Sequence, residues 1–146
     1  YHFRELMRRY GVEKPLVMNE GALLCFRSDP DCGPGGFYDD QPNYVARLYA
    51  RSFALGLYGT VWYTLNGPGW QEGGLLDANQ QPRPAFAAMR YMQQLLAGAG
   101  YAGGGVEGEL ERHRFTTPRG PVEILWLNAG EPREIPLPAG ARALYT

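Results

Sequence analysis

The sequence predicts an α/β fold that is followed by an all-β segment. Helical and strand patterns alternate over the first 98 residues, and no helical pattern follows Gly98. The apolar content of 45% and the charged content of 20% are typical of a globular protein. A length of 146 residues is that of one domain. Two parallel strands on their own would leave open edges and uncovered faces, so we expect further structure around them.

The first helix is expected over residues 3–10, where apolar residues recur at i, i+3, i+4 and i+7 before Gly11. A short apolar run over residues 16–18 follows Pro15 and is continuous rather than alternating. Such a run is typical of a buried parallel strand. This strand ends at Glu20.

Residues 22–40 are predicted to form a long loop, which is uncommon inside a compact domain and often functional. The second helix is expected to start near Pro42, with Asp39 or Asp40 as its cap. A second strand is expected over residues 60–65, followed by a turn-rich stretch over residues 66–74.

A third helix is expected from Pro84 to Leu96. We interpret residues 98–108 as a glycine-rich link. Strands are predicted over residues 108–117, 121–128, 135–137 and 141–145. Although the length by itself is that of one domain, this change of pattern predicts two parts, an α/β part over residues 1–98 and a partial β domain over residues 99–146.

The two cysteines, Cys25 and Cys32, are either free thiols or a short disulfide that would need an oxidising compartment. A zinc site is not expected, because the sequence has no CxxC motif or paired histidines. Asp29, Asp31 and Gly33 resemble the start of a calcium loop, but the other ligands of such a loop are absent. We therefore predict no metal and no cofactor.

The net charge of −1 offers no electrostatic case for binding nucleic acid or an anionic membrane. No run of about 20 apolar residues predicts a membrane span. The sequence begins at Tyr1 within a helical pattern, without a Met or a leader, so we expect a fragment or a processed chain. The compartment stays open, and export would agree with a Cys25–Cys32 disulfide.

The most informative residue is Glu20, because ligands of α/β folds bind at the carboxyl ends of parallel strands. Trp62 lies in the second strand, and Asn66 and Trp70 follow it. A carboxylate with aromatic rings suits a sugar, whose C–H faces stack on aromatic side chains. The alternatives are a solvated Glu20 and a Trp62 that belongs to the core. Glu72 is considered as a second carboxylate but is interpreted as a loop residue.

The stretch from Lys14 to Gly21 resembles the seventh strand of clan A retaining glycoside hydrolases, which are (β/α)8 barrels. Residues 59–66 resemble the eighth strand of these enzymes. Residues 74–77 and 81–89 resemble the phrase that opens their last helix, with Arg83 in place of the usual Lys and Phe86 in place of the usual Tyr. The resemblance covers nearly the whole chain.

This resemblance implies the C-terminal part of a TIM barrel, namely its last two β/α units, followed by a small sandwich-like β domain. Glu20 would match the nucleophile, and Trp62 the platform under the sugar. Asn66, Trp70 and Tyr38 are the other candidate substrate-binding residues. The acid/base Glu would lie on a fourth strand outside this sequence, so the remainder of the barrel is an expected partner and this chain alone is expected to be inactive.

Two other functions stay open. The chain could be a non-catalytic carbohydrate-binding or structural chain on a degenerate barrel. It could also be a complete small α/β protein with an unrelated function. An Asn-Glu pair about three strand–helix units upstream of Glu20 would favour the enzyme.

Overall fold

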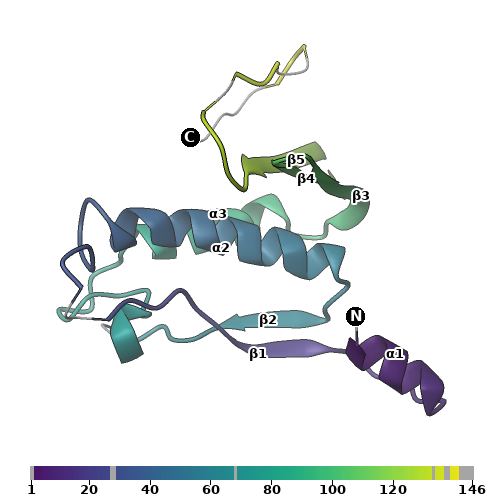
Figure 1. Cartoon of the computed structure of the whole chain (residues 1–146), viewed down its shortest axis with the longest axis horizontal. Coiled ribbons are helices and arrows are strands. Elements are labelled where there is room, and N and C mark those ends of the chain that lie inside the picture. Colours follow the sequence, from purple (N-terminus) through teal and green to yellow (C-terminus); the bar gives the residue numbers. More distant parts are fainter. Residues whose placement is uncertain (1, 27–28, 68, 133, 137–138, 142–146) are drawn as a thin grey trace.

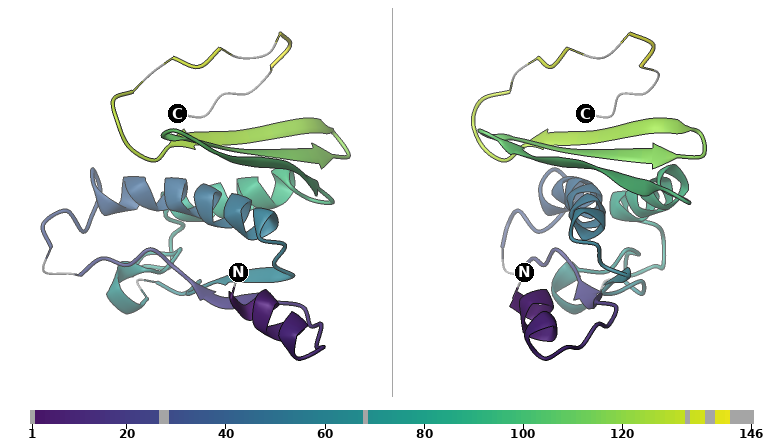
Figure 2. Two further views of the ribbon diagram at one scale, coloured as in Figure 1. Left: turned by 45° about the vertical axis from the view of Figure 1, so that its right-hand side comes forward. Right: turned by 90° about the vertical axis from the view of Figure 1, so that its right-hand side faces the viewer.

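The helices and strands form three layers (Figure 1). A computed structural model describes residues 2–26, 29–67, 69–132, 134–136 and 139–141. The two-stranded sheet of β1 (Val17–Gly21) and β2 (Gly59–Trp62) forms the first layer, and the helices α2 (Phe37–Ala54) and α3 (Pro84–Leu95) form the middle layer. The third layer is the sheet of β3 (Gly100–Glu107), β4 (Leu110–Thr117) and β5 (Gly120–Leu127), and Figure 2 shows it lying across the helices.

The strand–helix–strand unit is the expected one, because β1 and β2 pair in parallel and α2 connects them. Their register contains an irregularity. Met18 pairs with Thr60 and Gly21 pairs with Trp62, so β1 has one extra residue between these pairs. This arrangement is a β-bulge, which changes the direction of the side chains that follow it.

The second helix begins at Phe37, which is earlier than predicted. Carbonyl groups of the preceding loop accept hydrogen bonds from the first backbone N–H groups of the helix. Phe37 N donates to Asp31 O at 2.8 Å, and Asp40 N donates to Gly36 O at 3.1 Å. The helix therefore does not need Pro42 at its first position, and Pro42 lies inside it. Tyr38 is consequently a helical residue rather than part of a long loop.

The third helix begins at Pro84 as predicted, since Pro is well suited to a first helical position. The first helix, α1 (His2–Arg9), also lies close to its predicted range. It has no buried residue, and Arg4 joins it to the carbonyls of Leu55 and Gly56. None of the described helices is long and apolar enough to cross a membrane.

The interpretation of residues 98–108 as a link is wrong, because most of this segment is β3, paired antiparallel with β4. Its glycines allow close pairing: a Cβ on Gly104 would lie 2.1 Å from the carbonyl oxygen of Arg112. The strands β4 and β5 lie near the predicted ranges. Of the last two predicted strands, Ile135, Pro136 and Ala141 form no strand. Residue 137 and residues 142–145, which complete these two predictions, lie outside the described residues.

One hydrophobic cluster joins the helices to the three-stranded sheet. Phe53 of α2 meets Phe115 of β4 edge to face, with ring centroids 5.5 Å apart, and Tyr101 of β3 contacts the same ring at 5.6 Å. Trp62, Leu75 and Met92 belong to this cluster as well. The proposed division of the chain at residue 98 therefore falls between segments that share buried side chains, and it stays a prediction.

Candidate functional site

The loops that follow β1 and β2 lie at the same end of the molecule, opposite α1 (Figure 1). A backbone hydrogen bond of 2.8 Å from Cys25 N to Gln71 O joins them. Tyr63 N donates to Gly21 O at 2.9 Å directly beyond the paired strands. The structure therefore brings together the loop that follows Glu20 and the loop that carries Asn66 and Trp70.

Glu20 is exposed at the carboxyl end of β1. Its neighbour Gly21 is buried and faces α2, since a Cβ at that position would lie 3.0 Å from Leu48 Cδ2 and 3.3 Å from Met18 Sδ. Met18 and Gly21 thus share one face although they are three residues apart, as the bulge requires. Glu20 is left on the face of the sheet that α2 does not cover.

Trp62 packs as a core residue in this structure. Only 7% of the residue is exposed, and its indole N–H donates to Gly73 O at 2.9 Å. Its ring meets Tyr44 of α2 edge to face at 6.1 Å. The alternation of the strand then directs the next residue, Tyr63, to the opposite face, where it is 41% exposed.

Asn66 and Trp70 lie in the loop after β2, and both are exposed. Trp70 is 59% exposed and begins a short 3-10 turn, η1 (Trp70–Glu72). After Trp70 the chain returns to the interior of the protein, where Glu72 is 8% exposed and Leu75 is 2% exposed. The loop therefore presents the indole of Trp70 on its outer side.

Tyr38, which is half-buried, and the buried side chains of Glu72 and Arg83 form a cluster at the turn that follows Trp70, which we call the arginine clamp. Arg83 Nη2 lies 2.6 Å from Glu72 Oε2 and 3.0 Å from the Tyr38 hydroxyl. The Tyr38 hydroxyl in turn donates to Glu72 Oε2 at 3.0 Å. The Arg83 guanidinium lies 4.2 Å from the centre of the Tyr38 ring. Burial and the bond to Glu72 raise the pKa of Tyr38.

The clamp bears on Tyr38, a predicted substrate-binding residue, and on Glu72, which is interpreted from the sequence as a loop residue. The Tyr38 hydroxyl is already a donor to Glu72 and an acceptor from Arg83. The Glu72 carboxylate is bound to Arg83, which agrees with its interpretation as a structural loop residue rather than a second carboxylate of the site.

Arg83 and Tyr63 were missed by the sequence reasoning. Arg83 was considered only as part of the phrase that opens the third helix, and nothing in its local sequence indicates a side chain only 4% exposed. For Tyr63 a signal existed, because strict alternation places it on the face opposite to Trp62.

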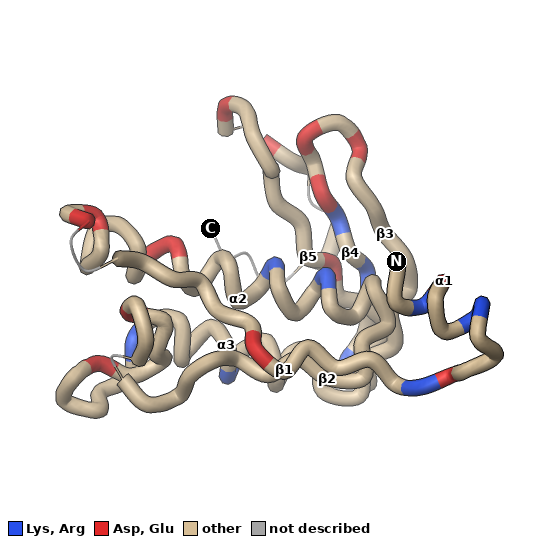
Figure 3. The backbone as a smooth tube through the Cα atoms, turned by 60° about the horizontal axis from the view of Figure 1, so that its bottom comes forward, with Lys and Arg blue, Asp and Glu red and all other residues tan. Residues whose placement is uncertain are grey.

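The cysteines are free thiols, so of the two alternatives the structure has the reduced pair. The pKa of Cys32 is raised to about 12, first by burial and then by its hydrogen bond with Cys25. Acidic residues occur along the loop between β1 and α2 (Figure 3). Among the described residues, no group of three or more His, Cys, Asp or Glu side chains is arranged to hold a metal ion.

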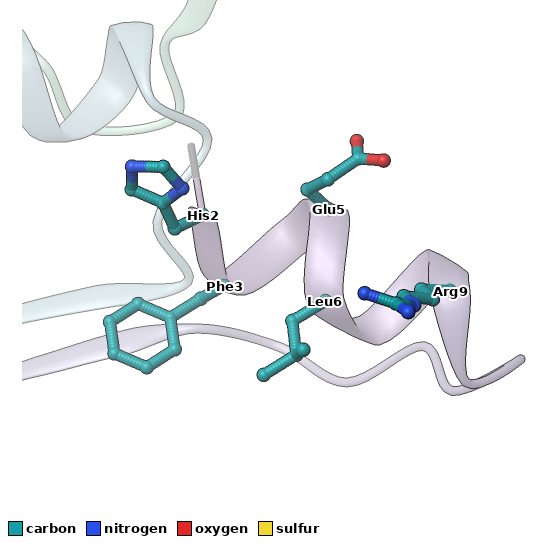
Figure 4. Close-up of a pocket in the computed structure, with 5 residues that line it drawn as sticks. All are labelled: His2, Phe3, Glu5, Leu6 and Arg9. Carbon is teal, nitrogen blue, oxygen red and sulfur yellow. The ribbon is translucent and has the colours of Figure 1, made fainter.

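A hollow at the other end of the strands lies against α1 (Figure 4). It is lined by side chains of this one helix, including His2, Phe3 and Leu6, and Phe3 and Leu6 point to the same side. Phe3 is 73% exposed. The hollow is therefore part of the open surface of α1, on the side away from Glu20.

Comparison with known proteins identifies a likeness of fold. No protein-family model and no curated protein matches the chain. A solved structure of a family 39 glycoside hydrolase from the gut symbiont Bacteroides cellulosilyticus WH2 superposes with a TM-score of 0.62 at 17% sequence identity. The match covers 88% of this chain but only 27% of that chain. The chain thus has the mixed α/β fold of part of a glycoside hydrolase.

Proposed function

We propose that this chain is the C-terminal part of a retaining β-glycoside hydrolase, with Glu20 as its nucleophile. One observation carries the proposal: an exposed carboxylate ends a strand of a parallel pair, in a chain whose fold matches part of a family 39 glycoside hydrolase. Active sites of α/β barrels lie at that end of the strands. In this proposal β1 and β2 are the last two strands of the barrel, and β3–β5 belong to an appended β domain.

Retaining hydrolysis proceeds by double displacement. Glu20 attacks the anomeric carbon and forms a covalent glycosyl-enzyme, while an acid/base carboxyl group protonates the leaving oxygen. The same group then removes a proton from the water that releases the sugar. The two carboxyl groups must lie about 5–5.5 Å apart. The proposal assigns the acid/base to an upstream part of the same barrel.

The remainder of the barrel also accounts for the uncovered face of β1 and β2. Four apolar side chains are between 41% and 56% exposed on or just beyond these strands, namely Val17, Val61, Tyr63 and Leu65. Burying them against further strands would remove apolar surface from water, which is favourable. Glu20 lies on the same face. In the closed barrel it would therefore lie near side-chain carboxyl groups that come from the carboxyl ends of neighbouring strands.

Replacement of Glu20 by Gln in the full-length protein tests the proposal. The amide cannot act as the nucleophile, so turnover of an activated aryl β-glycoside is expected to fall by about 10⁴-fold or more. Glu13→Gln is the matched control, because Glu13 is exposed in the segment that precedes β1, on the other side of the strand from Glu20 along the chain. Near-normal activity of Glu20→Gln would refute the assignment.

The competing function is carbohydrate binding without catalysis, which the exposed indole of Trp70 favours. A binder would retain its affinity for an oligosaccharide in the Glu20→Gln variant and would show no turnover in the wild type. Detectable hydrolysis by the wild type that is abolished in the variant excludes this alternative.

A further inference from the structure

The arginine clamp controls the backbone that carries Trp70. Arg83 Nη1 donates to the carbonyl oxygens of Glu72 at 2.7 Å and Gly74 at 3.2 Å, while Nη2 holds the Glu72 carboxylate. One guanidinium therefore binds both the main chain and the side chain of the turn directly after Trp70. Only the planar fork of an Arg has donors in this arrangement, since the ammonium of Lys is a single point of charge.

The turn held by Arg83 is conformationally strained. Gln71 has φ 48° and Glu72 has φ 59°, and both residues carry a side chain. Two consecutive non-glycine residues in the left-handed region persist only where surrounding contacts hold them. The Arg83 fork and the Cys25 N to Gln71 O bond are such contacts on either side of the turn.

We propose that Arg83 is a positioning residue, which holds the Gln71–Glu72 turn and thereby fixes the place of Trp70. In this proposal Trp70 is a stacking platform for a sugar ring beyond the ring whose glycosidic bond is cleaved. This inference rests on the proposed function. Trp70 lies on a loop rather than on the strand pair that ends in Glu20, so its platform suits a further ring of a β-linked oligosaccharide.

The test compares two substrates in the full-length protein, a β-linked oligosaccharide and an aryl monosaccharide glycoside. Trp70→Ala is expected to raise KM for the oligosaccharide about threefold to tenfold, the loss of one aromatic stacking contact. Arg83→Lys is expected to raise it in the same direction. In both variants KM for the oligosaccharide should rise more than KM for the aryl glycoside, and kcat for the oligosaccharide should change less than its KM. Arg90→Lys, on the exposed side of α3, is the matched control.

The double variant Trp70→Ala/Arg83→Lys separates positioning from a general structural role. If Arg83 acts through Trp70, the double variant has the KM of Trp70→Ala alone, because nothing is left to position. Additive effects, or equal losses on both substrates, would overturn the inference. Tyr38→Phe keeps the ring but removes the two hydrogen bonds of the Tyr38 hydroxyl, to Glu72 and from Arg83, and it replaces Arg83→Lys should that variant fail to fold.

Failure of this inference is distinguishable from failure of the proposed function. Loss of turnover in Glu20→Gln together with an unchanged oligosaccharide KM in Trp70→Ala would overturn the platform alone. Full activity of Glu20→Gln would overturn the proposed function. In that case the affinity for the oligosaccharide, measured by titration of tryptophan fluorescence, tests the role of Trp70 separately. Trp70→Ala must bind the oligosaccharide more weakly than the wild type if Trp70 is a stacking platform.

Discussion

Single residues in this protein are defined by partners that are distant in the sequence. Glu111 of β4 is an example outside the candidate site. Its carboxylate accepts bonds from Arg51 of α2 at 2.6 and 2.8 Å, and from Asn128 Nδ2 at 3.0 Å. It also lies 3.0 Å from His113 Nε2, whose other ring nitrogen lies 3.0 Å from the Tyr101 hydroxyl. This network joins the helical layer to the three-stranded sheet.

The bonds to Arg51, and then those to His113 and Asn128, lower the pKa of Glu111 from 4.5 to about 2. A carboxyl group whose pKa is lower in the folded state stabilises the fold fully above its unfolded pKa and loses that contribution as the pH falls. Thermal unfolding of the wild type should therefore show a loss of stability between about pH 4.5 and pH 2. Glu111→Gln should lack this component of the pH dependence.

At neutral pH Glu111→Gln is expected to lower the free energy of unfolding by about 1–3 kcal/mol, as for other lost bonds between charged groups. Glu107→Gln, on the exposed end of β3, is the control. Urea unfolding of the three proteins at pH 7 measures the difference. Equal stabilities would show that the network contributes nothing to the fold.

The pairing of individual strands depends on how closely their backbones can approach each other. The strand β3 is rich in glycine, which disfavours strands on propensity alone. It nevertheless pairs with β4 along its length, because Gly104 occupies a place where the carbonyl of Arg112 leaves no room for a side chain. The bulge in β1 is a second case, since it places Glu20 opposite to the helices.

Gly104→Ala is expected to destabilise the β3–β4 pairing. The added Cβ would lie 2.1 Å from Arg112 O, and the φ of +152° is unfavourable for a residue with a side chain. The cost should be about 1–3 kcal/mol or more, measured by urea unfolding. Gly105→Ala is the matched control, because a Cβ there has no atom within 4 Å. A control as damaging as Gly104→Ala would contradict this account.

At the scale of the whole molecule, the described residues form layers that leave one face of the parallel sheet exposed. The three-stranded sheet covers the helices on one side, and the helices cover β1 and β2 (Figure 2). The opposite face of β1 and β2 carries Val17 and Val61, each more than half exposed. The proposal that further barrel strands cover this face predicts how the chain behaves alone.

The purified 146-residue chain is expected to show no turnover of an aryl β-glycoside, because the proposed acid/base carboxyl group belongs to the upstream part of the barrel. A full-length protein assayed at the same concentration is the positive control. Turnover by the isolated chain that disappears in its own Glu20→Gln variant would show that this sequence carries both carboxyl groups.

Much of the local architecture was predictable from the sequence. Apolar spacing located the first and third helices, and a continuous apolar run located β1, because these patterns depend on neighbouring residues only. The start of α2 and the strand β3 were not predictable in this way. Their hydrogen bonds go to Asp31 and to β4, and those partners are brought close only by folding.

By itself, the sequence determined the alternation of strands and helices, and hence the place of Glu20 at the carboxyl end of a parallel strand. Only the tertiary structure decided that Trp62 packs as a core residue and that Glu72 is held by Arg83 and Tyr38. The physical reason is the range of the interactions. Periodicity along the chain reports which face of an element is apolar, whereas the burial of a polar side chain depends on partners far along the chain, which are 45 residues apart for Tyr38 and Arg83 and 60 for Arg51 and Glu111.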